Sequence, residues 1–199
     1  MIRKSIVVDA KGHLVGRMAS YVAKQLELGQ KVVIVRCESA LMGGKHIRNK
    51  LNFMDYLHKR CNTNPKHGPI HQKSPAQFIY RAIKGMLPYK TAKGAAALGR
   101  LKCFDGCPVS MNARKKMVIP DALKSVRLAP RARYSVVGNI CKECGWTKSE
   151  LLANMETKRI TKNHQWYLKK IQKIKDTNKA LKSNAELKKI DKELEQYGY

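Results

Sequence analysis

Acidic residues are scarce in this sequence, and one long segment has none. The 199 residues include 41 Lys and Arg but only 14 Asp and Glu, which gives a formal charge of +27. No Asp or Glu occurs from Tyr56 to Phe104, and residues 56–142 contain 18 Lys and Arg against 2 acids. Like charges at this density repel one another, and a polyanion such as RNA or DNA relieves the repulsion. The charge therefore predicts a nucleic-acid partner.

Long apolar segments are also missing. The N-terminus, MIRKSIVVDA, holds no apolar run of signal-peptide length, and no stretch approaches the roughly 18 apolar residues that a membrane span needs. Basic residues are spread over the whole length instead of lining one amphipathic helix, which argues against a membrane-surface role. With 43% hydrophobic residues, the chain can still bury one core. We therefore expect a soluble, intracellular protein with no membrane partner.

No catalytic or cofactor signature is present. A catalytic triad needs a nucleophile, a base and an orienting group, and residues 56–104 offer no acid for the last role. Gly12 and Gly16 follow one predicted strand and Glu38 follows the next, but AKGHLVGRMA lacks the G-x-G-x-x-G of a dinucleotide site. We therefore expect no enzyme activity, no cofactor and no small-molecule substrate. An RNA-modifying enzyme with an adenine cofactor stays open as an alternative.

The cysteines are too irregularly spaced to indicate a metal site. Cys103 and Cys107 form C-x-x-x-C, and Cys141 and Cys144 form C-x-x-C, so four thiols have the number that tetrahedral zinc requires. The first spacing is uncommon, Asp105 lies inside it, and nothing requires the two pairs to meet. Inside a reducing compartment, we expect free thiols and no bound metal. A zinc-dependent nucleic-acid module is the second alternative.

Hydrophobic periodicity predicts an α/β fold for the first half of the chain. Residues 5–9 and 31–36 have the pattern of strands, and apolar residues between them recur at helical spacing. The VVIV of the second strand is apolar on both faces, as in a strand that helices cover on each side. A strand, a helix and a strand within about 30 residues indicate a parallel, right-handed unit. We expect a three-layer α/β/α core with a short parallel sheet, in which Val32–Val35 pair with Ile6–Val8.

Two further helices are predicted, one on each side of a loop rich in Pro, Gly and Asn at residues 62–75. The earlier helix is expected to turn four apolar residues inward: Ile47, Leu51, Met54 and Leu57. The later helix should begin at Pro75, because Ser74 and Gln77 supply an N-cap and a capping box, and should end near Gly85. Its expected core residues are Ile79, Ile83 and Met86.

Beyond Pro130 the sequence contains no proline, and a helical tail is predicted. Thr147 and Glu150 have the spacing of a capping box at its start. Its apolar stripe is narrow and consists of Ile160, Tyr167, Ile171, Ile174 and Leu181. A stripe this thin cannot build its own core. We divide the chain into an RNA-binding core, 1–145, and a basic helical extension, 146–199, which should dock on RNA or a neighbouring protein.

The basic middle region supplies the candidate RNA contacts. Residues 94–99, GAAALG, carry little side-chain bulk, which would let main chain approach a sugar–phosphate strand. Aromatic residues make up only 7%, without paired ring motifs, so recognition of backbone and shape is expected. Gly68 and Pro69 separate His67 from His71, which favours contact with phosphates or bases over a shared metal. The candidate RNA-binding residues are Arg48, Lys50, Lys59, Arg60, Lys66, His67, His71, Lys73, Arg81, Lys84, Lys90, Lys93, Arg100, Lys102, Arg114, Lys115, Lys116, Arg131 and Arg133.

One run is similar to a known family. YRAIKGMLPYKTAKGAAALGRLKCFDG, residues 80–106, resembles the signature of the L-thirteen family of large-subunit ribosomal proteins, in its archaeal and eukaryotic cytosolic version. Residues 7–20, 32–53 and 62–69 resemble further blocks of that family, so the resemblance covers most of residues 5–108. It implies an α/β/α core, a structural role in the large subunit and no catalysis. The implied partners are large-subunit rRNA and neighbouring ribosomal proteins.

The resemblance also implies where the protein works. The tail after about Trp146 resembles the eukaryotic extension of the family. The expected location is the cytoplasm, on ribosomes, with passage through the nucleus or nucleolus during assembly. Lys115 and Lys116 fit a short nuclear import patch, although phosphate contact explains them equally well.

Overall fold

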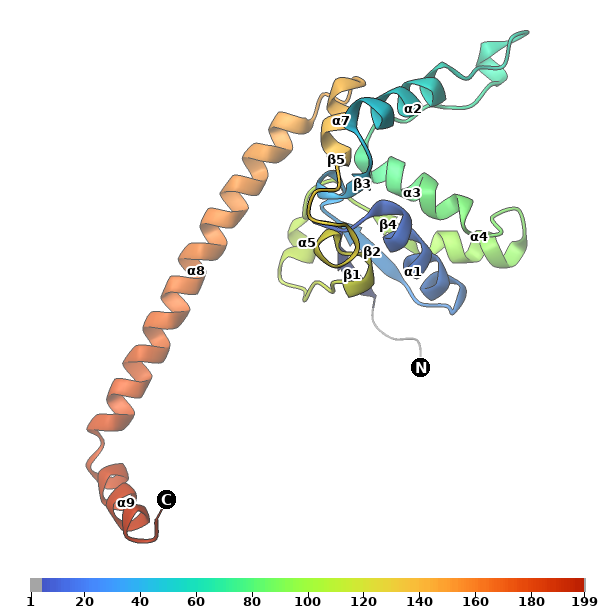
Figure 1. Ribbon diagram of the computed structural model, residues 1–199. Coiled ribbons are helices and arrows are strands. Elements are labelled where there is room, and N and C mark those ends of the chain that lie inside the picture. Colours follow the sequence, from blue (N-terminus) through green and yellow to red (C-terminus); the bar gives the residue numbers. More distant parts are fainter. Residues whose placement is uncertain (1–4, 199) are drawn as a thin grey trace. The chain divides into compact units, whose positions relative to one another are not determined.

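The computed structural model describes residues 5–198, apart from the side chains of residues 182, 185, 186, 188, 191 and 192. The chain divides into two compact units, Met1–Ala153 and Asn154–Tyr199, and each is described by itself. The first unit contains β1 (Ile6–Asp9), α1 (Val15–Glu27), β2 (Val32–Val35), η1 (Cys37–Ser39), β3 (Leu41–Gly43), α2 (His46–His58), η2 (Pro65–His67), α3 (Pro75–Gly85), α4 (Ala92–Gly99), β4 (Leu101–Cys103), α5 (Val109–Asn112), η3 (Pro120–Ala122), α6 (Lys124–Arg127), β5 (Tyr134–Val136) and α7 (Val137–Glu143). Helices α8 (Ser149–Ser183) and α9 (Ala185–Gln196) follow (Figure 1).

A three-stranded parallel sheet forms the centre of the first unit. Its strand order is β1-β2-β4, with Ile6 opposite Val32 and Val32 opposite Leu101. The predicted parallel pairing of the first two strands is therefore confirmed. The third strand, β4, has only three residues and was not predicted, because so short a segment carries no readable alternation.

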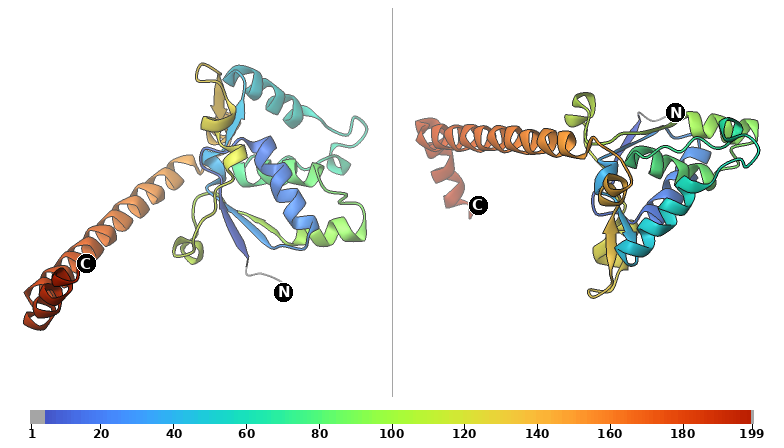
Figure 2. Two further views of the ribbon diagram at one scale, coloured as in Figure 1. Left: turned by 60° about the horizontal axis from the view of Figure 1, so that its bottom comes forward. Right: turned by 90° about the horizontal axis from the view of Figure 1, so that it is seen from above.

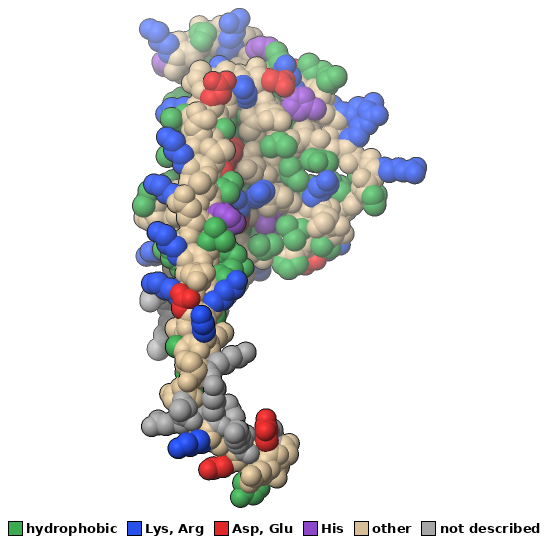
Figure 3. All heavy atoms as spheres, turned by 90° about the vertical axis from the view of Figure 1, so that its left-hand side faces the viewer, with side chains coloured by type: hydrophobic (Ala, Val, Ile, Leu, Met, Phe, Trp, Pro, Cys, Tyr) green, Lys and Arg blue, Asp and Glu red, His purple; other side chains and the backbone are tan. Residues whose placement is uncertain are grey.

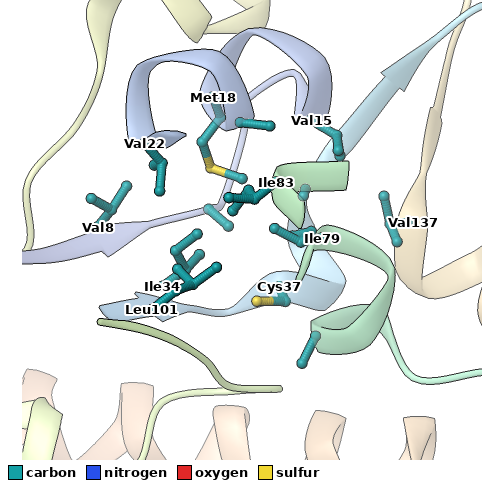
Figure 4. Close-up of a cluster of buried hydrophobic side chains, with 14 of the residues drawn as sticks. Val8, Val15, Met18, Val22, Ile34, Cys37, Ile79, Ile83, Leu101 and Val137 are labelled. Atoms are coloured by element: carbon teal, nitrogen blue, oxygen red, sulfur yellow. The ribbon is translucent and has the colours of Figure 1, made fainter. Parts of the chain in front are cut away.

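Both faces of β2 are buried, as its apolar sequence predicts. Val32 and Ile34 belong to the main core, which helices α1 and α3 cover with Met18 and Ile83 (Figure 4). On the other face, Val33 and Val35 pack with Val7 against Phe104 and against Met111 of the short helix α5. The predicted α/β fold with a short parallel sheet is confirmed. The layer that covers Val33 and Val35 is thin, because it consists of Phe104 and the short helix α5.

Helix α3 begins and ends where its sequence signals predict. The hydroxyl of Ser74 accepts a hydrogen bond from the Gln77 amide at 3.4 Å, and the helix ends at Gly85. Ile79 and Ile83 are fully buried. The prediction that Met86 faces the core is wrong: Met86 follows the last helical residue and is exposed, and the chain turns there so that Leu87 is buried instead.

Helix α2 forms as predicted but packs only partly through the predicted face: Leu57 is half-buried against the core and Met54 is half-buried, and the other two predicted residues are not inside. Ile47 and Leu51 are 71% and 54% exposed, whereas Asn49 and Phe53 are buried. The Asn49 amide donates hydrogen bonds to the Gly43 carbonyl at 3.1 Å and the Ser135 hydroxyl at 2.6 Å. A buried polar residue with satisfied hydrogen bonds thus defines the inner face of α2, and a search for apolar spacing alone misses it.

A second, two-stranded sheet joins distant parts of the first unit. Strand β3 pairs antiparallel with β5, placing Leu41 opposite Val136 and Gly43 opposite Tyr134. The Gly44 amide also donates to the Arg133 carbonyl at 2.9 Å. This sheet, which the sequence did not predict, brings residues 131–134 beside the first residues of α2.

The predicted helical tail is present as α8 and α9. Helix α8 begins at Ser149, one residue later than a Thr147 cap would place it, and the Glu150 carboxylate lies 3.4 Å from Lys142 Nζ. From residue 154 onward, nearly every described side chain of α8 is exposed. Glu156 and Arg159 are exceptions, because the Arg159 Nε donates to the Glu156 carboxylate at 2.7 Å across one turn. Local contacts of this kind support the helix.

Candidate nucleic-acid interface

The candidate RNA-binding residues lie on the surface of the first unit. Fourteen of the nineteen are exposed, and the other five (Lys50, His71, Lys84, Arg100 and Lys116) are half-buried. Twelve of them occur on α2, α3 and α4 or on the segments that join these helices, including the loop that leaves α2 and returns at the start of α3 (Figure 2). The other seven lie after α4 and on β4 (Arg100, Lys102), after α5 (Arg114, Lys115, Lys116) and before β5 (Arg131, Arg133). Figure 3 shows one face of the protein, where Lys and Arg side chains are widespread and Asp and Glu are few. The fold therefore displays most of the candidate basic residues at the surface, beside several exposed apolar side chains.

Some candidate residues already have partners within the protein. Lys50 Nζ lies 2.8 Å from the Glu143 carboxylate, which raises the pKa of Lys50 by hydrogen bonding and by charge. The guanidinium of Arg100 donates to the Leu26 carbonyl at 2.9 Å, at the C-terminal end of α1. A cation at this end of a helix satisfies a free carbonyl and interacts favourably with the helix dipole. Arg100 therefore has a structural role that the sequence did not indicate.

The basic residues that follow α5 also contact nearby chain atoms. Arg114 donates to the Ser5 hydroxyl at 2.8 Å, and Lys116 Nζ donates to the Asn112 carbonyl at 2.8 Å. Lys115, between them, is exposed. These contacts hold the segment against the start of the chain and leave Lys115 the most accessible charge of the three.

A basic hollow lies at the first turn of α2. Arg131 and Arg133 line it together with Lys45 and His46, and its volume is about 420 Å³. The first turn of α2 contains no acidic residue. The partial positive charge of its free amide groups therefore adds to the charge of these cations. The second sheet thus brings Arg131 and Arg133 beside the start of α2, which is about 85 residues earlier in the sequence.

The glycine-rich segment at residues 94–99 forms helix α4 rather than an extended strand. The Thr91 hydroxyl accepts a hydrogen bond from the Gly94 amide at 3.2 Å and caps the helix. Gly94 is buried against the preceding turn, where an added Cβ would lie 1.9 Å from the Pro88 carbonyl oxygen. The small size of Gly94 therefore serves internal packing, while an added Cβ at Gly99 would meet nothing within 4 Å.

An aromatic cluster that the sequence pattern did not predict lies beside the basic residues of α2 and α3. The guanidinium carbon of Arg81 is 3.3 Å from the centre of the Tyr56 ring, and the His71 ring meets the same ring edge-on at 4.7 Å. Phe53 stacks with Tyr56 at 6.0 Å and contacts Phe78 at 5.4 Å. Overall the chain has few aromatic residues, but five of them occur between residues 53 and 89. That local enrichment was the available signal.

The residues considered for a dinucleotide site or a metal site have other roles in the fold. Glu38, the residue weighed for a ribose contact, accepts a hydrogen bond from the Gly106 amide at 2.8 Å. Burial raises the pKa of Cys141 to about 12, so its thiol stays protonated at neutral pH. All six cysteines are free, and no group of three His, Cys, Asp or Glu that could hold a metal occurs within residues 5–198 as described. That the protein binds no metal stays a prediction.

None of the helices in the described part of the chain is long and apolar enough to cross a membrane. A small α/β core with a surface of exposed cations is typical of a basic nucleic-acid-binding protein. The family model for ribosomal protein L13 matches residues 3–110. Because the match covers more than half of the chain, this chain belongs to the ribosomal protein L13 family, whose members are structural components of the large ribosomal subunit.

Proposed function

We propose that this protein binds large-subunit rRNA and stabilises its folded form without catalysing a reaction. The observation that carries the proposal is the segment from Tyr56 to Phe104, which has no acidic residue and displays its cations at the surface. Phosphate groups are the natural counter-charge for such a surface, because their neutralisation releases condensed counterions. Membership of the L13 family supports rRNA as the polyanion.

We expect the loop between α2 and α3 to bind RNA without regard to its base sequence. Lys59, Arg60, Lys66 and Lys73 are exposed and lie on or beside the loop that joins α2 to α3. Cations in this setting contact phosphates and fix the orientation of the protein without reading bases. We therefore expect most of the affinity to come from phosphate contacts, with the candidate residues that have internal partners, such as Arg100, contributing less.

The tail has a different task within the same proposal. Its exposed cations include Lys169, Lys170, Lys173 and Lys175, and its apolar stripe lacks a partner within the second unit as described. We propose that the tail docks on rRNA or on a neighbouring ribosomal protein. We further propose that the protein is of the archaeal and eukaryotic cytosolic type and works on cytoplasmic ribosomes after assembly in the nucleolus.

Salt dependence tests the phosphate contacts. If about 8 cations engage phosphates, the affinity for purified large-subunit rRNA should fall with salt at a log–log slope of about −6 to −7. Replacing Lys59, Arg60, Lys66 and Lys73 by Gln should make the slope shallower by about 3. The matched control replaces Lys11, Arg17, Lys24 and Lys31 by Gln, four exposed cations outside the candidate RNA-binding set, and should change the slope less. A slope near zero for the unaltered protein overturns the proposal.

Location in the ribosome is tested by sucrose-gradient fractionation of a cell lysate. The tagged full-length chain should sediment with the large subunit and with translating ribosomes, and should stay there in moderate salt. A chain that remains at the top of the gradient contradicts a structural role in the subunit.

A further inference from the structure

A groove with aromatic walls separates α2 from α3 in the middle of the basic surface. Its volume is about 440 Å³, and residues of α2, of the loop at 69–72, of α3 and of the following turn line it. The rings in its wall belong to Phe53, Tyr56, Phe78, Tyr80 and Tyr89. Phe53 is buried, Tyr56, Phe78 and Tyr80 are half-buried, and Tyr89 is exposed. A groove lined by several partly exposed rings indicates a binding site.

Arg81 occupies a central position in this groove. It lines the groove and also an adjoining hollow of about 440 Å³, and it lies over the Tyr56 ring at 3.3 Å. Lys84 Nζ lies over the Tyr89 ring at 4.5 Å, one turn further along α3. Each cation therefore contacts a ring at the wall, and Arg81 stays exposed to solvent. Planar guanidinium groups and aromatic rings are the groups on which proteins stack unpaired bases.

Polar groups suited to a base edge lie in the same groove. Gln72 and Gln77 line it and are exposed, so their amides are free to donate and to accept hydrogen bonds. Ile70, also in the lining, is exposed despite its apolar side chain. A ligand with a flat aromatic body and a hydrogen-bonding rim matches this combination of walls and amides.

Charge identifies the occupant. Except for Phe53, the residues that line the groove belong to the segment that lacks acids from residue 56 to residue 104, and Lys59, Arg60, Lys66 and Lys73 lie close to them in sequence. An apolar side chain from a neighbouring protein would fill the groove but leave these cations without counter-charge. An RNA strand supplies both parts, because a base can enter the groove while its flanking phosphates meet the cations.

We propose that the groove between α2 and α3 takes an unpaired nucleobase of the bound RNA, stacked among its rings and Arg81, with Gln72 and Gln77 at its edge. This inference rests on the proposed RNA binding and adds a specific contact to it. The protein then recognises a bulged or looped nucleotide in addition to backbone and shape.

Two RNA probes test the proposal with the full-length protein. One is a hairpin with a single bulged 4-thiouridine, and the other is the same hairpin fully paired. The bulged probe should bind about tenfold tighter, because stacking of one base on aromatic side chains contributes an effect of that size. Irradiation should crosslink the 4-thiouridine to peptides that contain Tyr56 or the segment 77–89, as mapped by mass spectrometry.

Two variants separate stacking from charge. Arg81→Lys keeps the charge but loses the planar group, so it should lower the preference for the bulged probe several-fold while keeping the salt slope. Tyr89→Ala, at a side chain that is 42% exposed, should have a similar effect. The control is Tyr21→Ala, because Tyr21 is 45% exposed but bonds to Asp121 at 2.8 Å, away from the groove. It should leave the preference unchanged.

The outcomes distinguish this inference from the function on which it rests. If neither probe binds, both the RNA-binding function and the base site are wrong. If both probes bind equally with a steep salt slope, RNA binding stands and the base site is overturned, which leaves the groove to a protein side chain. Crosslinks confined to residues outside the groove overturn the base site as well. Circular dichroism on each variant confirms that it is folded.

Discussion

The two units of this protein both carry positive charge, but the first has a buried core and the second consists of exposed helices. In residues 5–153 the cations lie over a sheet whose central strand is buried on both faces. In residues 154–198 they lie on helices whose described side chains are almost all exposed. Burial of apolar surface stabilises the first unit, whereas short-range pairs such as Glu156 with Arg159 support the second. Substitutions should therefore affect the stability of the first unit strongly and that of the second weakly.

The largest expected effect comes from Gly94. An alanine Cβ there would lie 1.9 Å from the Pro88 carbonyl oxygen, so the turn before α4 must move. Gly94→Ala should lower the free energy of unfolding by about 3 kcal/mol, measured by urea denaturation. Gly99→Ala is the matched control in the same helix, where the new methyl group meets nothing, and should change stability by less than about 0.5 kcal/mol. Equal effects at both positions would contradict the packing described for α4.

His13 gives the next largest effect. The fully buried ring donates from Nδ1 to the Lys11 carbonyl at 3.1 Å and accepts at Nε2 from the Ile119 amide at 3.0 Å. His13→Gln should cost about 1–3 kcal/mol, because one amide group cannot take the place of both ring nitrogens and leaves one of the two backbone groups without its partner. His164→Gln, on the exposed tail, is the control and should have no measurable effect.

The His13 effect should depend on pH in a defined direction. Burial lowers the pKa of His13 below its usual 6.5, so the folded protein favours the neutral ring. The unfolded chain binds the proton more readily. The stability that neutral His13 contributes is therefore fully present above pH 6.5 and is lost as the pH falls toward the lowered pKa of the folded protein. The difference between the original protein and His13→Gln should shrink on acidification. A difference that is constant from pH 7 to pH 5 would contradict this assignment.

Replacement of Asp105 should change the free energy of unfolding less than replacement of His13, and should raise it instead of lowering it. Burial raises the pKa of Asp105 to about 6, partly offset by a hydrogen bond from the Ala76 amide and reinforced by the charge of Glu38. The folded protein thus favours the protonated form, and the stability from this group is present below pH 3.8 and lost as the pH rises through 6. Asp105→Asn should raise stability at pH 7 by about 1 kcal/mol. Asp176→Asn, in the tail, is the control, and a loss of stability in Asp105→Asn at pH 7 would contradict the argument.

Removal of the tail should have the smallest effect on stability. Deleting residues from Lys158 onward removes side chains that are mostly exposed, so the melting temperature of the remaining chain should change by no more than about 1 °C. Differential scanning calorimetry gives this value. The truncated protein should nevertheless leave the large subunit at lower salt than the full-length chain. A lowered melting temperature would show that the tail belongs to the folded core.

The sequence predicted the parallel sheet because VVIV is apolar on both faces and follows a helix with clear spacing. It predicted α3 for a similarly local reason, the N-cap at Ser74. It predicted α2 as a helix but placed Ile47 and Leu51 inside wrongly, because the buried face is organised by Asn49, whose partner Ser135 is 86 residues away. The second sheet was missed for the same reason, since β3 and β5 are short and distant in sequence.

For the candidate site, composition was sufficient to locate the basic surface but not to describe its shape. Arg81 was chosen for its charge, and its place over Tyr56 depends on packing between two helices that no local pattern encodes. Arg100 was chosen in the same way, and its bond to the Leu26 carbonyl depends on the fold that joins β4 to α1. Charge is readable from sequence, whereas the partners of each charge are set by tertiary contacts.

Binding of rRNA by the basic middle segment can be measured by ultraviolet crosslinking of intact large subunits, followed by mass spectrometry of the crosslinked peptides. This chain should crosslink to rRNA mainly through residues 56–142, with the segment around Arg81 prominent. Crosslinks to rRNA found only in the tail, or none in the subunit at all, would contradict this prediction.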